Sequence, residues 1–185
     1  MNNPLIVCAL KDEFNIETGQ YSLLHTGVGK VNAAMSLTEY MLLNKKPSFV
    51  INYGTAGSVN GKYTGLVEVD VLIQRDMNTE PQAPRGVVPF DNSAYSGAIM
   101  LNSNTNITCG TGDSFVKEHD PWFDYANVDL VDMEAYALAR VCKDFGVNFR
   151  CFKYISDMAD ENAPKTWQKN IQNGQKIFQK RLTDL

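Results

Sequence analysis

The strongest constraint on the fold comes from two short, almost wholly apolar runs separated by a stretch with helical periodicity. Residues 4–10 (PLIVCAL) and 48–53 (SFVINY) lack the polar alternation of a strand that has one face in water. Such runs are typical of strands buried on both faces, which occur in sheets covered by helices on each side. Between them, residues 31–43 repeat apolar side chains at helical spacing, with Val31 and Met41 on one predicted face. This order of elements predicts an α/β fold.

Glycine-containing segments adjoin these elements. Residues 27–30 (GVGK) precede the predicted helix, and residues 54–58 (GTAGS) follow the second apolar run. We interpret both as turns, in which glycine lets backbone amides approach a ligand closely. Neither has the spacing of the dinucleotide fingerprint or of the P-loop, so a bound dinucleotide or ATP is disfavoured.

Weaker patterns predict the remaining elements. Further strands are expected at 21–26, 67–75, 97–101, 106–110 and 149–155, a long loop at 76–96, a helix before Gly146, and a single amphipathic helix within 164–185. We find no repeat, low-complexity tract or linker. The sequence therefore predicts a single domain over residues 1–185.

Composition excludes several classes of function. A net charge of -4 and a pI near 5.2 argue against nucleic acid or an anionic membrane as partner. No stretch reaches the length of a membrane span, and the N-terminus lacks the basic region of a signal peptide, so we expect a cytoplasmic protein. Four scattered cysteines without a Cys-x-x-Cys pair predict reduced core residues. With only two histidines besides, we expect no metal site.

Two acidic clusters bound the stretch 131–160. Asp132 and Glu134 stand at the front of a predicted helix, and Asp157 follows the predicted strand 149–155. Carboxylates at one edge of an α/β unit are placed to hold a polyhydroxylated or heterocyclic ligand. Ordinary structural roles stay open, namely a first-turn acid for Glu134 and a helix N-cap for Asp157.

Five segments, in this order, resemble the nucleoside phosphorylase/nucleosidase superfamily, and within it the 5′-methylthioadenosine/S-adenosylhomocysteine nucleosidases. They are HTGVGKVNAA (25–34), INYGTAGSV (51–59), TGDSFV (111–116), VDMEAYALARVCKDFGV (131–147) and YISDMAD (154–160). The resemblance implies a three-layer α/β/α fold with a central mixed, twisted sheet, and a homodimer. It also implies hydrolysis of a purine nucleoside such as 5′-methylthioadenosine or S-adenosylhomocysteine to free base, without cofactor or metal.

The resemblance also assigns roles to residues. Glu13 corresponds to the base that activates water, with Thr55 helping to hold that water, and Asp157 corresponds to the acid at purine N7. Such an acid works near neutral pH only when its pKa is raised. Glu134 corresponds to the acceptor for the two ribose hydroxyls, and Phe115 to the residue that stacks on the purine.

Other positions of the same motifs complete the predicted substrate site. They are Val28, Gly57, Val116, Asp132, Met133 and Ser156, with Leu10 and Trp167 expected at the 5′ end of the nucleoside. Two features depart from the family. Lys153 stands where an arginine commonly helps to order the water, and lysine lacks the planar fork of arginine. The loop 76–96 does not match the family segment that closes over the 5′ substituent.

Two alternatives stay open at this point. A phosphorylase of this superfamily carries arginines near the exit of the first strand, where this chain has Lys11, Asp12 and Glu13. An acid there repels phosphate and favours water, although Arg75 and Arg85 are available to a phosphate site. The second alternative is a nucleoside-binding protein that kept the fold without the activity.

Overall fold

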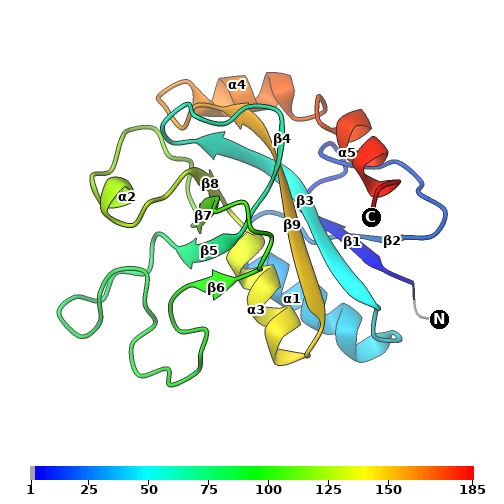
Figure 1. Ribbon diagram of the computed structural model, residues 1–185, viewed down its shortest axis with the longest axis horizontal. Helices are drawn as coiled ribbons and strands as arrows, with labels where there is room; N and C mark the ends of the chain where they lie inside the picture. The colour runs from blue at the N-terminus through cyan, green and yellow to red at the C-terminus, as the bar shows by residue number, and fades with distance from the viewer. Residues whose placement is uncertain (1–2) are drawn as a thin grey trace.

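In the part of the chain that the structure describes, a nine-stranded mixed sheet forms the centre of the fold (Figure 1). The computed structural model describes residues 3–185. The strands are β1 (Leu5–Cys8), β2 (Ser22–His25), β3 (Phe49–Ser58), β4 (Leu66–Glu68), β5 (Val71–Gln74), β6 (Ile99–Met100), β7 (Thr108–Thr111), β8 (Leu130–Asp132) and β9 (Asn148–Asp157). The order is β2-β1-β3-β8-β7-β5-β6, and β9 pairs with both β3 and β4.

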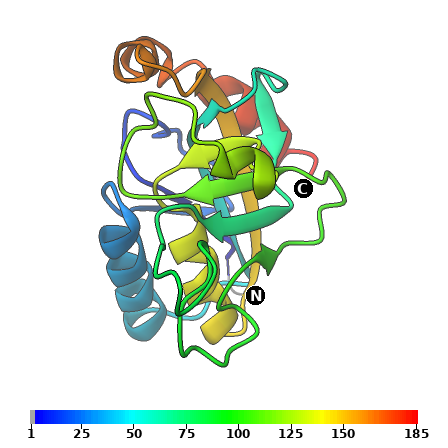
Figure 2. The same cartoon turned by 90° about the vertical axis from the view of Figure 1, so that its left-hand side faces the viewer.

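Helices cover both faces of the sheet. They are α1 (Lys30–Leu43), α2 (Trp122–Tyr125), α3 (Ala135–Asp144), α4 (Ala163–Asn170) and α5 (Gln175–Leu182). Both ribbon views place α1 beside α3, and these two share a core with Leu5 and Val7 of β1 (Figures 1 and 2). On the opposite face, Phe178 of α5 packs against Ile6 and Tyr53. The predicted α/β/α architecture with a mixed sheet is therefore confirmed, whereas the single domain over residues 1–185 stays a prediction.

The long parallel pair β3 and β9 organises the sheet. Their register runs from Phe49 opposite Asn148 to Ala56 opposite Ile155, and it shifts by one residue so that Gly57 lies opposite Asp157. The interpretation of residues 54–58 as a turn is therefore wrong, because residues 54–57 pair with β9 and Ser58 pairs with Leu130 of β8. Gly57 is required for close approach instead: a Cβ there would lie 2.6 Å from Oδ1 of Asp157.

Two other predicted elements are each divided in the structure. The strand expected at 67–75 forms β4 and β5, which pair with different strands, and between them the Asp70 carboxylate accepts hydrogen bonds from the amides of Ser103 and Asn106. The single C-terminal helix predicted within residues 164–185 is instead two helices, α4 and α5. Turns at residues 171–174 separate the two helices, and a Cβ at Gly174 would overlap Tyr53 and lie 2.5 Å from Cγ of Tyr154.

The buried face of α1 also differs from the predicted one. Ala33, Leu37 and Met41 face the core, whereas the side chain of Val31 is 76% exposed. The apolar residues of this helix are thus divided between two faces. Within residues 3–185, none of the helices combines the length and apolar character that a membrane crossing requires.

Candidate active site

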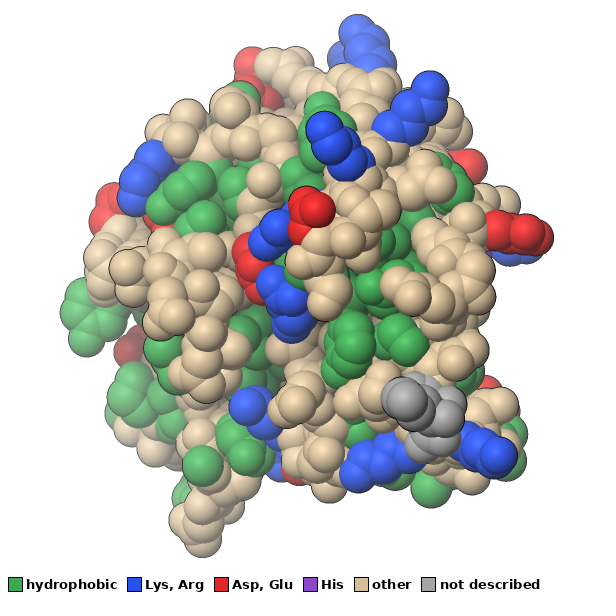
Figure 3. All heavy atoms as spheres, turned by 45° about the vertical axis from the view of Figure 1, so that its right-hand side comes forward, with side chains coloured by type: hydrophobic (Ala, Val, Ile, Leu, Met, Phe, Trp, Pro, Cys, Tyr) green, Lys and Arg blue, Asp and Glu red, His purple; other side chains and the backbone are tan. Residues whose placement is uncertain are grey.

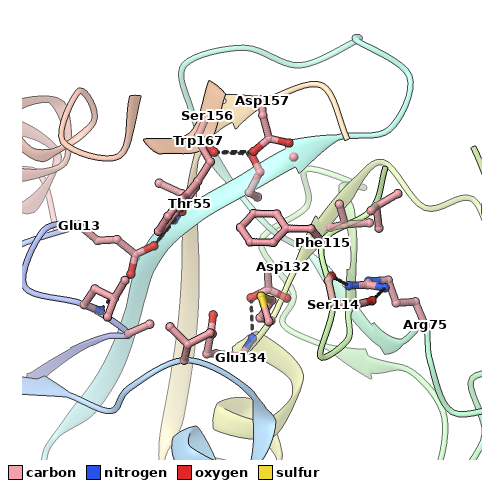
Figure 4. Close-up of a pocket in the computed structure, with 18 residues that line it drawn as sticks. Glu13, Thr55, Arg75, Ser114, Phe115, Asp132, Glu134, Ser156, Asp157 and Trp167 are labelled. Atoms are coloured by element: carbon pink, nitrogen blue, oxygen red, sulfur yellow. Dashed lines mark hydrogen bonds between the residues drawn. The ribbon is translucent and has the colours of Figure 1, made fainter. Parts of the chain in front are cut away.

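One pocket of about 170 Å³ collects every residue that the sequence motifs assigned to the site (Figure 4). It opens where β1, β3, β8 and β9 end. Its lining comprises Ala9, Leu10, Glu13, Val28, Thr55, Ala56, Gly57, Arg75, Ser114, Phe115, Val116, Val131, Asp132, Met133, Glu134, Ser156, Asp157 and Trp167. The motifs did not predict the five lining residues Ala9, Ala56, Arg75, Ser114 and Val131.

Glu13 lies on one side of the pocket, held by backbone and side-chain donors. Its Oε1 accepts hydrogen bonds from Thr55 N at 2.9 Å and Thr55 Oγ1 at 2.8 Å, and its Oε2 accepts one from Leu10 N at 3.2 Å. The Nε1 of Trp167 donates to the same Thr55 hydroxyl at 2.9 Å. Although the residue is only 5% exposed, its carboxylate thus has three protein donors and faces the pocket.

Asp132 is the last residue of β8 rather than part of the following helix. Its Oδ2 lies 2.8 Å from Lys153 Nζ and accepts a hydrogen bond from Ala135 N at 2.8 Å, while Thr111 Oγ1 donates to Oδ1 at 2.6 Å. Burial alone would raise the pKa of Asp132, but Lys153 and these donors outweigh burial and lower it. Burial likewise opposes the charge of Lys153, yet Asp132 holds the lysine pKa well above its ordinary value.

This arrangement clarifies the role of Lys153. It does not line the pocket; its side chain is 1% exposed, and its ammonium group is paired with Asp132, which does line the pocket. Asp132 in turn caps α3 by accepting from the Glu134 and Ala135 amides. The side chain of Glu134 makes no capping bond and is free to face the pocket.

Glu134 lines the pocket at its lower side in the view of Figure 4, on a different side from Glu13 and Asp157. Its Oε1 accepts a hydrogen bond from Gly29 N at 2.8 Å, so the residues before α1 are tied to the start of α3. Burial, with a further contribution from Asp132, raises the pKa of Glu134 to about 8. The alternative interpretation of Glu134 as an ordinary acidic residue in the first turn of a helix is therefore not needed, because its carboxyl group bonds Gly29 and faces the pocket.

Asp157 lies across the pocket, at the end of β9 (Figure 4). Burial raises its pKa, and hydrogen bonds from Ala159 N at 3.0 Å and Ser156 Oγ at 2.8 Å offset part of that shift. It forms a local turn rather than capping α4, which begins at Ala163. Asp157 therefore stays protonated at higher pH than an exposed aspartate.

The loop 112–116 closes the remaining side. Arg75 supports it, donating to the Gly112 carbonyl at 2.9 Å and to the carbonyl and hydroxyl oxygens of Ser114. Phe115 projects into the pocket, 41% exposed, and its ring makes an edge contact with Trp167 at 5.8 Å. The sequence offered Arg75 only as a possible phosphate ligand; its support of this loop depends on tertiary contacts.

Comparison with known proteins shows the family to which the chain belongs. A sequence model of the phosphorylase superfamily matches residues 8–185. The chain belongs to the phosphorylase superfamily. Within this superfamily it is 33% identical over 184 residues to a Bacillus velezensis 5′-methylthioadenosine/S-adenosylhomocysteine nucleosidase, covering 84% of this chain and 78% of the relative. An Exiguobacterium protein of the same name is 34% identical over 168 residues, covering 78% and 70%.

A solved structure has the same fold. The Helicobacter pylori 5′-methylthioadenosine/S-adenosylhomocysteine nucleosidase, in complex with butyl-thio-DADMe-Immucillin-A, superposes with a TM-score of 0.82. The match covers 100% of this chain and 99% of that one at 22% identity. The resemblance inferred from the five segments is therefore confirmed at the level of family and fold.

The buried ion pair yields a stability prediction. Lys153→Met leaves the Asp132 carboxylate buried without its cation, and we expect the free energy of unfolding to fall by about 3–5 kcal/mol. Urea denaturation measures this loss. The matched control is Lys62→Met, because Lys62 is exposed and its Nζ lies 3.9 Å from Oδ1 of Asp129. This substitution should lower the free energy of unfolding far less. Equal effects of the two substitutions would refute the assigned role of the pair.

The raised pKa of Glu134 predicts a pH dependence of stability. Between its ordinary value of 4.5 and about 8, the folded protein holds a proton that the unfolded chain releases. The contribution of Glu134 to the free energy of unfolding therefore falls as pH rises through this range. We expect Glu134→Gln to lose this part of the dependence and to gain stability over the wild type towards pH 8. Urea titrations of both proteins at several pH values test this, and parallel curves would contradict it.

Proposed function

We propose that this protein is a nucleosidase that hydrolyses the N-glycosidic bond of an adenine nucleoside, such as 5′-methylthioadenosine or S-adenosylhomocysteine, and releases the free base. The observation that carries the proposal is the placement of Glu13, Glu134 and Asp157 on three sides of one pocket, each in a different environment. The names of the two bacterial relatives support the same activity. The reaction needs an acid for the base, an acceptor for the sugar and a base for water.

Asp157 is the proposed acid at the purine. Its raised pKa suits proton delivery to N7, which lets the base leave without negative charge. Phe115 and Val116 are the proposed purine contacts, through ring stacking and the backbone respectively. Ser156 and Gly57 belong to the same end of the site, where Ser156 bonds Asp157 and Gly57 leaves room for its carboxyl group.

Glu134 is the proposed partner of the ribose. Its two carboxyl oxygens suit two vicinal hydroxyls. Met133 is proposed to pack against the sugar ring, and Val28 to line the 5′ end. Asp132 acts beneath them, because its carboxylate is already occupied by Lys153 and Thr111.

Glu13 is the proposed general base for water. It accepts the proton of the attacking water while the hydroxyl group adds to the anomeric carbon. Its attachment to Thr55 on β3 sets its distance from the sugar. Asp12, which the sequence left as a neighbouring alternative, is exposed and does not line the pocket.

Hydrolysis is favoured over phosphorolysis because the two buried cations at the site, Lys153 and Arg75, already have protein partners. Lys153 is paired with Asp132, and the guanidinium of Arg75 donates to Gly112 and Ser114. Arg85 is also paired, because its Nη2 lies 2.6 Å from Oδ2 of Asp120. A phosphate beside Glu13 would meet a carboxylate instead of a free guanidinium.

A homodimer is part of the proposal. Val31, Met35 and Leu42 lie on one face of α1 at helical spacing and are 76%, 63% and 69% exposed. Val28 and Phe115, at the mouth of the pocket, are each 41% exposed. A second copy packed on α1 would bury this apolar face and cover the pocket mouth.

Location and partners complete the proposal. The four cysteines are free and buried, which suits a reducing compartment such as the cytoplasm. On the face of the molecule in Figure 3, basic and acidic side chains lie among apolar ones. This mixture and the net charge of -4 support a small-molecule substrate rather than nucleic acid or a membrane.

Base release from a panel of nucleosides tests the activity. Purified protein should release adenine from 5′-methylthioadenosine or S-adenosylhomocysteine at the same rate with and without phosphate. Glu13→Gln should lower kcat by roughly 100-fold or more, the usual contribution of a general base, while adenine still binds. Asp12→Asn is the matched control and should stay close to the wild type. A strict requirement for phosphate would instead establish a phosphorylase, and absence of base release from every nucleoside would leave a binding protein.

The dimer has its own test. The chain mass is 20.6 kDa, and light scattering at micromolar concentration should give twice this value. Met35→Glu places a charge on the exposed face of α1 and should shift the protein towards monomer. Ile177→Glu, on the exposed face of α5, is the control and should not. A monomeric wild type would rule the dimer out.

A further inference from the structure

Trp167 is attached to the proposed water base through a single intermediate group. Its indole Nε1 donates to Thr55 Oγ1 at 2.9 Å, and Thr55 Oγ1 lies 2.8 Å from Glu13 Oε1. A hydroxyl group has one proton to donate and accepts through its lone pairs. Because the indole N–H already occupies the hydroxyl as an acceptor, the hydroxyl proton is directed to Glu13.

This chain of hydrogen bonds distinguishes the two carboxylate oxygens of Glu13. Oε1 accepts both the amide and the hydroxyl of Thr55, at 2.9 and 2.8 Å. Oε2 accepts a single, longer bond of 3.2 Å from Leu10 N. The oxygen with unused acceptor capacity is therefore Oε2, and the Thr55 donors hold the carboxylate so that the same oxygen stays available.

The position of Trp167 also connects the two ends of the pocket. Its ring makes an edge contact with Phe115, at 5.8 Å between centroids, from the loop on the purine side. The helix α4 that carries it is fastened to the end of β9, because Asn170 Nδ2 donates to the Ser156 carbonyl at 2.8 Å. The indole is thus held at a fixed place between the purine contact and the water base.

We propose that Trp167 is a positioning residue for the hydrolytic step: its N–H orients the Thr55 hydroxyl and thereby the Glu13 carboxylate, with Oε2 facing the attacking water. This inference rests on the proposed nucleosidase activity. A ring without the N–H should still fill the pocket and contact Phe115. The ring and the N–H therefore have separable effects, on binding and on turnover respectively.

Trp167→Phe separates these effects. A lost neutral hydrogen bond corresponds to about 0.5–1.5 kcal/mol, so we expect kcat to fall roughly 2- to 12-fold with KM changed less than about twofold. Trp122→Phe is the matched control, because the only other tryptophan stacks on Arg85 at 4.4 Å, outside the pocket, and should leave kcat unchanged. An active protein whose kcat is unaffected by Trp167→Phe would overturn the proposal, as would a change confined to KM.

A double-mutant cycle tests the route through Thr55. In a Thr55→Val background the hydroxyl is absent, so adding Trp167→Phe should lower kcat no further. Multiplicative losses from the two substitutions would show that Trp167 acts independently of Thr55 and would reject the route.

Fluorescence tests the contact without relying on catalysis. In Trp122→Phe protein all tryptophan emission comes from Trp167, and Thr55→Val in that background should shift its emission maximum by removing the N–H acceptor. Adenine should also change this emission. Wild-type protein that releases no base from any nucleoside would defeat the proposed function, whereas emission that responds to neither change would defeat the placement of Trp167.

Discussion

The buried ion pair between Lys153 and Asp132 is the interaction on which the rest of the site depends. The Asp132 carboxylate joins the end of β7 through Thr111, the start of α3 through Ala135, and β9 through Lys153. Taking two charges out of water is costly, and such a pair is tolerated only when the remaining acceptor sites are filled, as they are here. Four elements of the fold therefore meet at fixed positions directly beneath the pocket.

The same pair explains how carboxyl groups close in sequence acquire different properties. Asp132 is kept ionised and caps α3, so the side chain of Glu134, two residues later, has no structural bond to the helix. Placed beside that fixed negative charge and away from water, Glu134 has its pKa raised to about 8. Environment rather than residue type distinguishes them, as in other sites where paired carboxyl groups take different roles.

Sequence patterns succeeded where local chemistry decides the outcome and failed where pairing decides it. The apolar runs became β1 and β3, and the motif order collected all predicted site residues around one pocket. Residues 54–58 read as a turn because two glycines lie within them, yet pairing with β9 makes them strand. The last helix divides at residues 171–174, and the packing of Gly174 against Tyr53 and Tyr154, which leaves no room for a side chain, is a tertiary contact that no local pattern reveals.

The sequence by itself determined the α/β class, the family and the acidic residues that end the strands, because strand length, glycine spacing and motif order are properties of consecutive residues. Only the tertiary structure decided that Lys153 serves Asp132 and that Trp167 reaches Thr55, across 112 positions of the chain. Such contacts depend on the register of β3 with β9 and on where α4 rests on them. Neither is encoded in a local pattern, since register is set by the packing of the whole sheet.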